Sequence, residues 1–269
     1  MKNYILLLSI ISIISFLTCK SDAKDDKEEE SESEWVNLFN GENLDGWIPK
    51  FHHHEVGENY ANTFRVKDGV IQVNYEDYTS FDERYGHLFY KEPFSSYHLQ
   101  FDYRFTNQWM EDAPDYAYRN SGVMFHSQAP ETILKEQDWP ISVEYQMLAN
   151  AGDGKPRPTG NMCSPGTEVF FEGEMDPRHC IESSSDTYSL GEWVQAELIV
   201  YGDSLVIHKV NGEKVLEYTK PQIGGEVVSG YDPKIKKDGK SLSEGYIALQ
   251  AEGQGVEFKK IRIKKISDR

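Results

Sequence analysis

The chain has 269 residues and a formal net charge of −17 at pH 7. Such an acidic surface excludes nucleic acids and anionic lipid headgroups as partners, because it would repel both polyanions. Neutral solutes suit this surface better.

The N-terminal segment has the features of a lipoprotein signal peptide. Lys2 supplies a basic end, residues 5–17 are almost wholly apolar, and the small residue Thr18 precedes Cys19, a pattern that resembles a lipobox. We therefore expect residues 1–18 to be a signal peptide and a lipid on Cys19 to be the only membrane anchor. The apolar run is shorter than the roughly 20 residues that cross a bilayer.

An acidic tract follows this segment. Residues 19–34 begin with Cys19, and the stretch from Lys20 to Glu34 holds nearly only Lys, Asp, Glu and Ser. Such a composition buries nothing and repels itself, so we expect an extended tether followed by one folded domain over residues 35–269. The tract also resembles the surface-export signal of Bacteroidetes lipoproteins, which implies an outer-membrane lipoprotein that faces the periplasm or the cell exterior.

Export would place the three cysteines of the chain in an oxidising compartment. If Cys19 is lipidated, Cys163 and Cys180 are left as an even pair, and we predict that they form a disulfide. Two buried free thiols are the alternative.

Nine segments of the folded part have the composition of β-strands, rich in β-branched and aromatic residues and separated by Gly, Asp, Asn or Pro. Two hairpin turns are predicted, at Lys67-Asp68-Gly69 and at Asn211-Gly212. Many short strands without an internal repeat predict an all-β jelly-roll sandwich of two antiparallel sheets. The nine segments are 64–66, 70–73, 98–105, 122–126, 142–148, 194–201, 204–210, 246–251 and 256–263.

Alternation along three of these strands separates apolar from polar side chains, because neighbours on a strand point to opposite faces. In residues 142–148, Val143 and Tyr145 are expected to face the core, with Glu144 and Gln146 on the opposite face. A face lined with amides, carboxylates and imidazole suits sugar hydroxyls, which need donors and acceptors in fixed directions. An ordinary solvated face is the alternative. The polar side chains expected together are Asn120, His126, Glu144, Gln146, Gln250 and Glu252.

Five short motifs occur in order along the chain, beginning with LFNGENLDGW at residues 38–47. They continue with NSGV at 120–123, VEYQML at 143–148, GEW at 191–193 and, after the Asn211-Gly212 turn, GYIALQ at 245–250. In this order they resemble the DUF1080 family, whose members are described as 3-keto-glucoside lyase/hydratase or 3-keto-disaccharide hydrolase domains. The resemblance covers about Trp35 to Ile266 and implies a concanavalin A-like jelly roll.

The resemblance also implies a reaction. Its substrate is a glycoside that a separate enzyme has already oxidised at C3; a base removes the acidified C2 proton, the glycosidic oxygen leaves C1, and water adds back to give net hydrolysis. On this activity, Glu144 is the candidate base, Glu252 an assisting acid, and His126 or His179 a donor to the enolate or the leaving oxygen. The expected substrate-binding residues are Asn120, Gln146, Gln250, Arg119 and Trp109.

Two other functions fit the same residues. A conventional glycoside hydrolase would use Glu144 and Glu252 as paired carboxylates. A non-catalytic carbohydrate-binding lipoprotein would use the same face without turnover, with Trp109 and Tyr116 stacking on sugar rings. The chain departs from the family at two positions, since many members carry Arg where His126 stands and His where Glu252 stands, and chemistry changes more readily than fold.

No cofactor is expected, and no metal site is assigned. Three consecutive histidines, His52-His53-His54, cannot all converge on one ion from a strand. Acidic residues are abundant enough for a structural calcium ion, yet no EF-hand spacing occurs.

Overall fold

The computed structural model describes Met1 and residues 34–267. The predicted signal peptide beyond Met1, the lipidation of Cys19 and nearly all of the predicted tether fall outside these residues and stay predictions. Residues 34–267 belong to one compact unit. In this part of the chain, no helix has the length and apolar character that crossing a membrane requires.

The strands between residues 34 and 267 form two sheets, one of ten strands and one of seven. The same residues also form three single turns of 3-10 helix, η1 (Tyr60–Asn62), η2 (Asp115–Ala117) and η3 (Pro130–Thr132). The ten-stranded sheet contains β1 (Val36–Asn37), β3 (Phe64–Lys67), β4 (Val70–Val73), β6 (Ser96–Trp109), β10 (Thr167–Phe171), β11 (Glu174–Met175), β13 (Val194–Tyr201), β14 (Leu205–Val210), β15 (Glu213–Ile223) and β17 (Gln254–Lys265). The seven-stranded sheet contains β2 (Trp47–Phe51), β5 (Gly86–Tyr90), β7 (Asn120–Ser127), β8 (Val143–Leu148), β9 (Asn161–Cys163), β12 (Cys180–Ile181) and β16 (Tyr246–Ala251).

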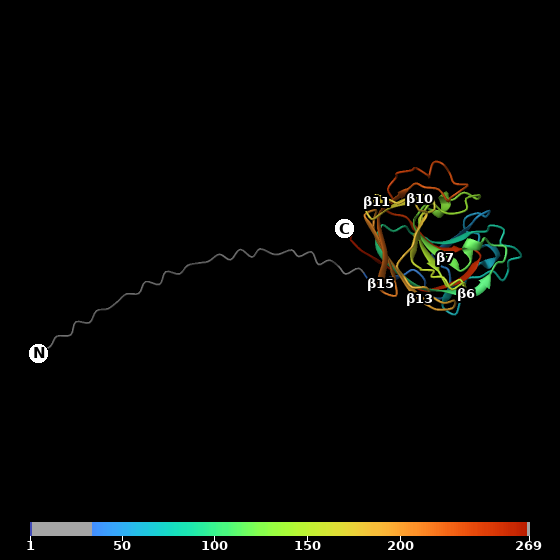
Figure 1. The fold of residues 1–269 in the computed structure, drawn as a ribbon, viewed down its shortest axis with the longest axis horizontal. Coiled ribbons are helices and arrows are strands. Elements are labelled where there is room, and N and C mark those ends of the chain that lie inside the picture. The colour runs from blue at the N-terminus through green and yellow to red at the C-terminus, as the bar shows by residue number, and fades with distance from the viewer. Residues whose placement is uncertain (2–33, 268–269) are drawn as a thin grey trace. The chain divides into compact units, whose positions relative to one another are not determined.

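Every pair of neighbouring strands in these sheets is antiparallel. The larger sheet has the order β11-β10-β15-β14-β13-β6-β17-β4-β3, with β1 paired to β17, and the smaller has the order β12-β9-β8-β7-β16-β5-β2. Figure 1 labels β6, β10, β11, β13 and β15 of the larger sheet and β7 of the smaller one. The all-β fold of two antiparallel sheets is therefore confirmed.

Both predicted hairpins are present, β3 to β4 and β14 to β15. Asp68 and Gly69 have φ values of 53° and 76°, and Asn211 and Gly212 have φ values of 49° and 85°. Two successive residues with positive φ give a turn whose twist matches antiparallel strands, and Asn, Asp and Gly adopt that conformation most easily. The turn residues therefore fix the register of both hairpins.

The core lies between the sheets and is strongly aromatic. Alternate residues of β6, such as Leu99 and Phe101, and of β8, such as Val143 and Tyr145, are almost fully buried there. Each such side chain contributes roughly 1.5–3 kcal/mol on burial. Side chains alternate along a strand. Because Val143 and Tyr145 point into the core, the intervening residues of β8 point to the outer face of the seven-stranded sheet.

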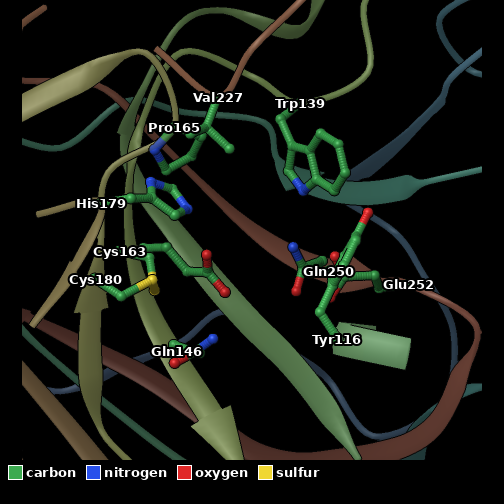
Figure 2. A pocket seen from close by; sticks show the side chains of 11 residues that line it. Tyr116, Trp139, Gln146, Cys163, Pro165, His179, Cys180, Val227, Gln250 and Glu252 are labelled. Carbon is green, nitrogen blue, oxygen red and sulfur yellow. A yellow bond between two sulfur atoms is a disulfide. The ribbon is translucent and has the colours of Figure 1, made fainter. Parts of the chain in front are cut away.

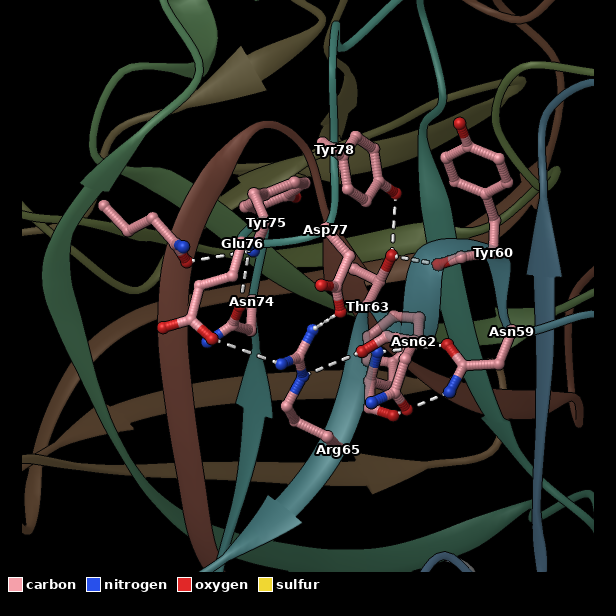
Figure 3. Close-up of polar contacts among 12 residues, drawn as sticks. Asn59, Tyr60, Asn62, Thr63, Arg65, Asn74, Tyr75, Glu76, Asp77 and Tyr78 are labelled. Carbon is pink, nitrogen blue, oxygen red and sulfur yellow. Dashed lines mark hydrogen bonds and ion pairs between the residues drawn. The ribbon is translucent and has the colours of Figure 1, made fainter.

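A polar network holds the segment after β4 at the edge of the ten-stranded sheet (Figure 3). Arg65 forms ion pairs with Glu76 at 3.4 Å and with Asp77 at 3.1 Å. The same segment contains Tyr75, whose buried hydroxyl oxygen accepts the backbone N–H of Gly253 at 2.7 Å. Gly253 lies in the bend that follows β16, so Tyr75 fixes the position of that bend.

Candidate functional site

A cavity of about 310 Å³ opens on the outer face of the seven-stranded sheet. Figure 2 shows Gln250, Glu252 and Tyr116 on one wall, and His179 with the Cys163–Cys180 bridge on the other. Strands β8, β9, β12 and β16 and the loops beside them supply its lining. The lining residues are Tyr116, Trp139, Glu144, Gln146, Cys163, Pro165, His179, Cys180, Val227, Gln250 and Glu252.

Glu144 of β8 is the central acidic group of this cavity. Its side chain is buried, and burial alone raises its pKa to about 8. The neighbouring strand β7 makes room for the carboxyl group, because a Cβ atom at Gly122 would lie 2.2 Å from Glu144 Oε1 and 2.7 Å from Glu144 Cδ. The Glu144 carboxyl group therefore packs directly against Gly122, the glycine of the NSG motif. Any side chain at position 122 would displace this carboxyl group.

Glu252 is the second carboxyl group, in the bend that Tyr75 fixes. It is only 3% exposed, and its Oε2 has no hydrogen-bond partner among the described residues. Burial raises the pKa of Glu252 well above its usual value, and the charge of Glu144 raises it further. Two carboxyl groups coupled in this way titrate as a pair, so that one can hold a proton while the other ionises.

Two amides complete the polar lining, and hydrogen bonds fix the orientation of one of them. The backbone N–H of Ser183 donates to Asn161 Oδ1 at 2.9 Å, so Asn161 Nδ2 is the atom that donates to Gln146 Oε1, at 3.0 Å. Gln146 therefore presents its NH₂ group as a remaining donor. Gln250 is buried, and its Oε1 accepts no hydrogen bond from the described residues.

Aromatic side chains form the part of the cavity next to Glu252. The rings of Tyr85 and Trp139 have centroids 4.1 Å apart, and the hydroxyls of Tyr85 and Tyr116 are hydrogen-bonded at 2.9 Å. Tyr116 comes from η2, and Trp139 comes from the loop after η3. These rings give an apolar surface of the kind on which a sugar ring packs.

The disulfide between Cys163 and Cys180 forms part of the opposite wall. The two residues are paired directly across β9 and β12, and Cys163 is also the cross-strand partner of Glu144. His179 precedes Cys180 at the rim, where partial desolvation lowers the pKa of its imidazole. Although these three residues lie close together, the bridged sulfurs are not the thiolates that a metal ion binds.

Replacing both cysteines with Ser is expected to destabilise the domain by about 3 kcal/mol. The disulfide closes a loop between residues 17 apart in sequence, and without it the unfolded chain gains conformational entropy. For a domain of this size, the Tm falls by roughly 6–12 °C. Thermal unfolding of the oxidised protein, the reduced protein and the double variant measures the effect. A double variant as stable as the oxidised protein would contradict the prediction.

The structure corrects the prediction for His126, which does not line the cavity. Tyr246 pairs with Ser127 but Ala248 pairs with Met124, so β7 has one extra residue and a bulge, and the φ of His126 is 47°. A bulge breaks the alternation of side chains. The His126 ring turns away from the outer face, and its Nε2 is 2.9 Å from the carbonyl oxygen of Gly202, between β13 and β14.

Three other predicted residues also lie outside the lining. Asn120 is buried at the start of β7, where its Nδ2 donates to the Tyr116 carbonyl at 3.2 Å and so supports the turn that carries Tyr116. The Arg119 guanidinium donates to the Asn150 carbonyl. The Trp109 ring packs edge-on against Tyr118, with centroids 5.3 Å apart. The predicted residues that do line the cavity are Glu144, Gln146, His179, Gln250 and Glu252.

Two further polar residues on the same sheet face were not predicted from the sequence. His87 of β5 is the cross-strand partner of Gln250, and Lys50 of β2 is the partner of His87. Both are buried; burial lowers the pKa of His87 to about 3 and that of Lys50 to about 8. The signal was present, because His87 alternates with Leu88 in the strand GHLFY, but this segment was not among the predicted strands.

A sequence model of the 3-keto-alpha-glucoside-1,2-lyase-like domain matches residues 34–264. No functionally curated protein matches the chain.

Solved structures share the fold at low identity. Two candidate glycosyl hydrolases from Parabacteroides distasonis have TM-scores of 0.52 at 21% and 18% identity; the matches cover 90% and 87% of this chain and 97% and 100% of theirs. A Bacillus subtilis protein of unknown function with a galectin-like fold also has a TM-score of 0.52, at 12% identity, with 88% of this chain and 96% of that chain covered. These likenesses confirm the jelly-roll fold.

Proposed function

Because this chain belongs to the 3-keto-alpha-glucoside-1,2-lyase-like domain family, and so to a group of carbohydrate-active proteins, we propose that it cleaves glycosides already oxidised at C3. The observation that carries the proposal is the pair of buried carboxyl groups, Glu144 and Glu252, in one cavity with raised pKa values. Strongly perturbed carboxyl groups in a cleft are typical of acid–base catalysis.

The two carboxyl groups have different roles in the proposed elimination. The Glu144 carboxylate takes the proton from C2, and the electron pair of that C–H bond becomes part of an enolate with the C3 ketone. The enolate then forms the C1–C2 double bond as the C1–O bond breaks, and the protonated Glu252 gives its proton to the leaving oxygen. The products are an unsaturated keto sugar and the free alcohol.

Hydration reverses the proton movements. The Glu252 carboxylate takes a proton from water as the oxygen adds to C1, and the Glu144 carboxylic acid returns a proton to C2. The overall change is hydrolysis of the glycosidic bond, and both side chains end in their starting protonation states. The NH₂ group of Gln146 and the amide of Gln250 provide donors for the enolate oxygen and the sugar hydroxyls.

The pKa values favour this reaction over conventional glycoside hydrolysis. A retaining glycosidase needs one carboxylate that is fully ionised at neutral pH to act as the nucleophile. Here burial raises the pKa of both Glu144 and Glu252, and no ion pair holds either one in its charged form among the described residues. In contrast, a general base that removes an acidified proton from carbon, such as the C2 proton here, works best when its pKa is near the working pH.

Turnover is expected for a 3-keto-glucoside and not for its unoxidised parent. In D₂O the released keto sugar is expected to carry deuterium at C2, because Glu144 exchanges its proton before hydration. Mass spectrometry of both incubations measures cleavage and label together. Cleavage of both substrates without label would instead indicate a glycosidase, and binding without cleavage would indicate a carbohydrate-binding protein.

The proposed substrate requires a separate enzyme that oxidises the C3 hydroxyl group. The lipid anchor on Cys19 and the outer-membrane location are part of the same proposal, in which the protein acts on sugars outside the cytoplasm.

A further inference from the structure

A cluster of side chains that can bind a metal ion lies outside the cavity, beside the end of β2. One ring nitrogen each of His52 and His53 and one carboxylate oxygen of Glu83 lie within 4.8 Å of one another. We propose that these three residues bind a divalent transition-metal ion of the zinc class.

Hydrogen bonds orient both imidazoles for this role. His52 Nδ1 lies 2.9 Å from the backbone carbonyl oxygen of Glu83, and His53 Nδ1 lies 2.9 Å from Glu136 Oε2. A carbonyl and a carboxylate are acceptors, so in the neutral rings Nδ1 carries the proton and Nε2 carries the lone pair. A backbone carbonyl or a carboxylate on the second nitrogen is the usual support of a metal-bound histidine.

The backbone conformation brings the ligands together. Side chains of successive residues in an extended chain point to opposite sides, but the φ of His53 is 70°, and its ring stacks on that of His52 with centroids 3.6 Å apart. Glu83 also has a positive φ, of 54°. Residues other than glycine rarely adopt this conformation, and such conformations are common at binding sites.

The donor set selects the class of metal. Two imidazole nitrogens and one carboxylate oxygen, with water in a fourth position, match the coordination that Zn²⁺ adopts in proteins. Calcium and magnesium prefer oxygen ligands alone, so a calcium ion is not the expected occupant here.

The site would join three segments near the cavity. His52 and His53 follow β2, Glu83 precedes β5, and Glu136 belongs to the loop that carries Trp139. The backbone N–H of His53 also donates to the Lys135 carbonyl at 2.8 Å. Since Trp139 lines the cavity, an ion on this cluster would restrain the loop that forms one edge of the cavity.

Binding is measured by calorimetry on the full chain, freed of metal with EDTA and titrated with ZnCl₂ and, separately, with CoCl₂ for its visible absorption. We expect one ion per chain and a higher Tm with ZnCl₂. His53→Gln and Glu83→Gln are expected to weaken binding at least tenfold, and Glu136→Gln, which keeps all three ligands, by about 10–100-fold. His54→Gln is the matched control, because His54 is hydrogen-bonded to Glu58 and lies outside the cluster.

His53 and Glu136 are substantially exposed. In the absence of metal, the variants at these two positions are therefore expected to have the same Tm as metal-free wild-type protein. Wild-type protein that binds neither ion, or a His53→Gln variant that binds as tightly as wild type, would overturn the proposal. A Tm that CaCl₂ raises and ZnCl₂ does not would overturn it as well.

Discussion

Replacing Glu144 with Gln is expected to lower the kcat for a 3-keto-glucoside by about 10²–10⁴-fold, the usual contribution of a general base. The amide keeps the size of the side chain over Gly122, so the fold and the shape of the cavity stay the same. Steady-state kinetics measure the loss, with the exposed Glu174→Gln of β11 as the control. Turnover at the wild-type rate would remove Glu144 as the base.

The same variant has a pH signature that does not depend on activity. Burial gives Glu144 a folded-state pKa of about 8, above its usual value of 4.5. As the pH rises from about 4.5 to about 8, the unfolded chain releases this proton while the folded chain keeps it, so wild-type stability falls. Glu144→Gln removes this loss and should become more stable than wild type by a few kcal/mol at pH 8, since one pKa unit corresponds to about 1.4 kcal/mol.

Denaturant unfolding at pH 5 and at pH 8 measures this difference. An equal difference in free energy of unfolding between variant and wild type at both pH values would contradict a raised pKa for Glu144.

Replacing Gly122 with Ala is expected to lower kcat about 100-fold, the effect of misplacing a catalytic group by about 1 Å. The new methyl group would occupy the space of the Glu144 carboxyl group and lie 2.7 Å from Glu144 Cγ, so the side chain of Glu144 has to adopt another rotamer, for which the adjoining cavity leaves space. The Tm is therefore expected to change little. Kinetics and thermal unfolding of the same preparation test both parts.

Two controls separate this effect from general disruption of a strand. In Gly224→Ala, the added Cβ lies 2.4 Å from the carboxyl carbon Cδ of Glu168, and neither residue lines the cavity, so kcat is expected to stay near wild type. In a Glu144→Gln background, Gly122→Ala should cause no further loss of activity. A full 100-fold loss in that background would show that Gly122 acts on something other than Glu144.

Most of the fold could be predicted because local patterns and tertiary structure agree. Strands β13 and β16 have the predicted bounds, and the two turns with Asp-Gly and Asn-Gly give the expected hairpins. β15 was not among the nine predicted segments, because charged residues and Pro221 interrupt its pattern. Its pairing with β14 through the Asn211-Gly212 turn and with β10 overrides the weak local signal.

The candidate site was predictable wherever the strands are regular. Simple alternation placed Glu144, Gln146, Gln250 and Glu252 on one face, and all four line the cavity. It failed at His126, because a bulge in β7 reverses the side chain and no residue type in the sequence marks it.

The cluster of His52, His53 and Glu83 could not be predicted from alternation either, here because the backbone brings together side chains that alternation would separate. Alternation separates His52 from His53, whereas a single positive φ at His53 stacks their rings. Glu83 and Glu136 are distant in sequence, so only the folded chain brings them to these rings.

The paired acidic side chains of the cavity also decide which inhibitors the protein should accept. Many glycosidase inhibitors are amines whose positive charge is attracted to an ionised carboxylate. Because burial raises the pKa of both Glu144 and Glu252, this cavity carries less negative charge than an ordinary pair of carboxylates, so a cationic iminosugar gains less there. An uncharged, flat ring with an enol or lactone oxygen matches these groups better, and selective inhibitors are to be sought among such compounds.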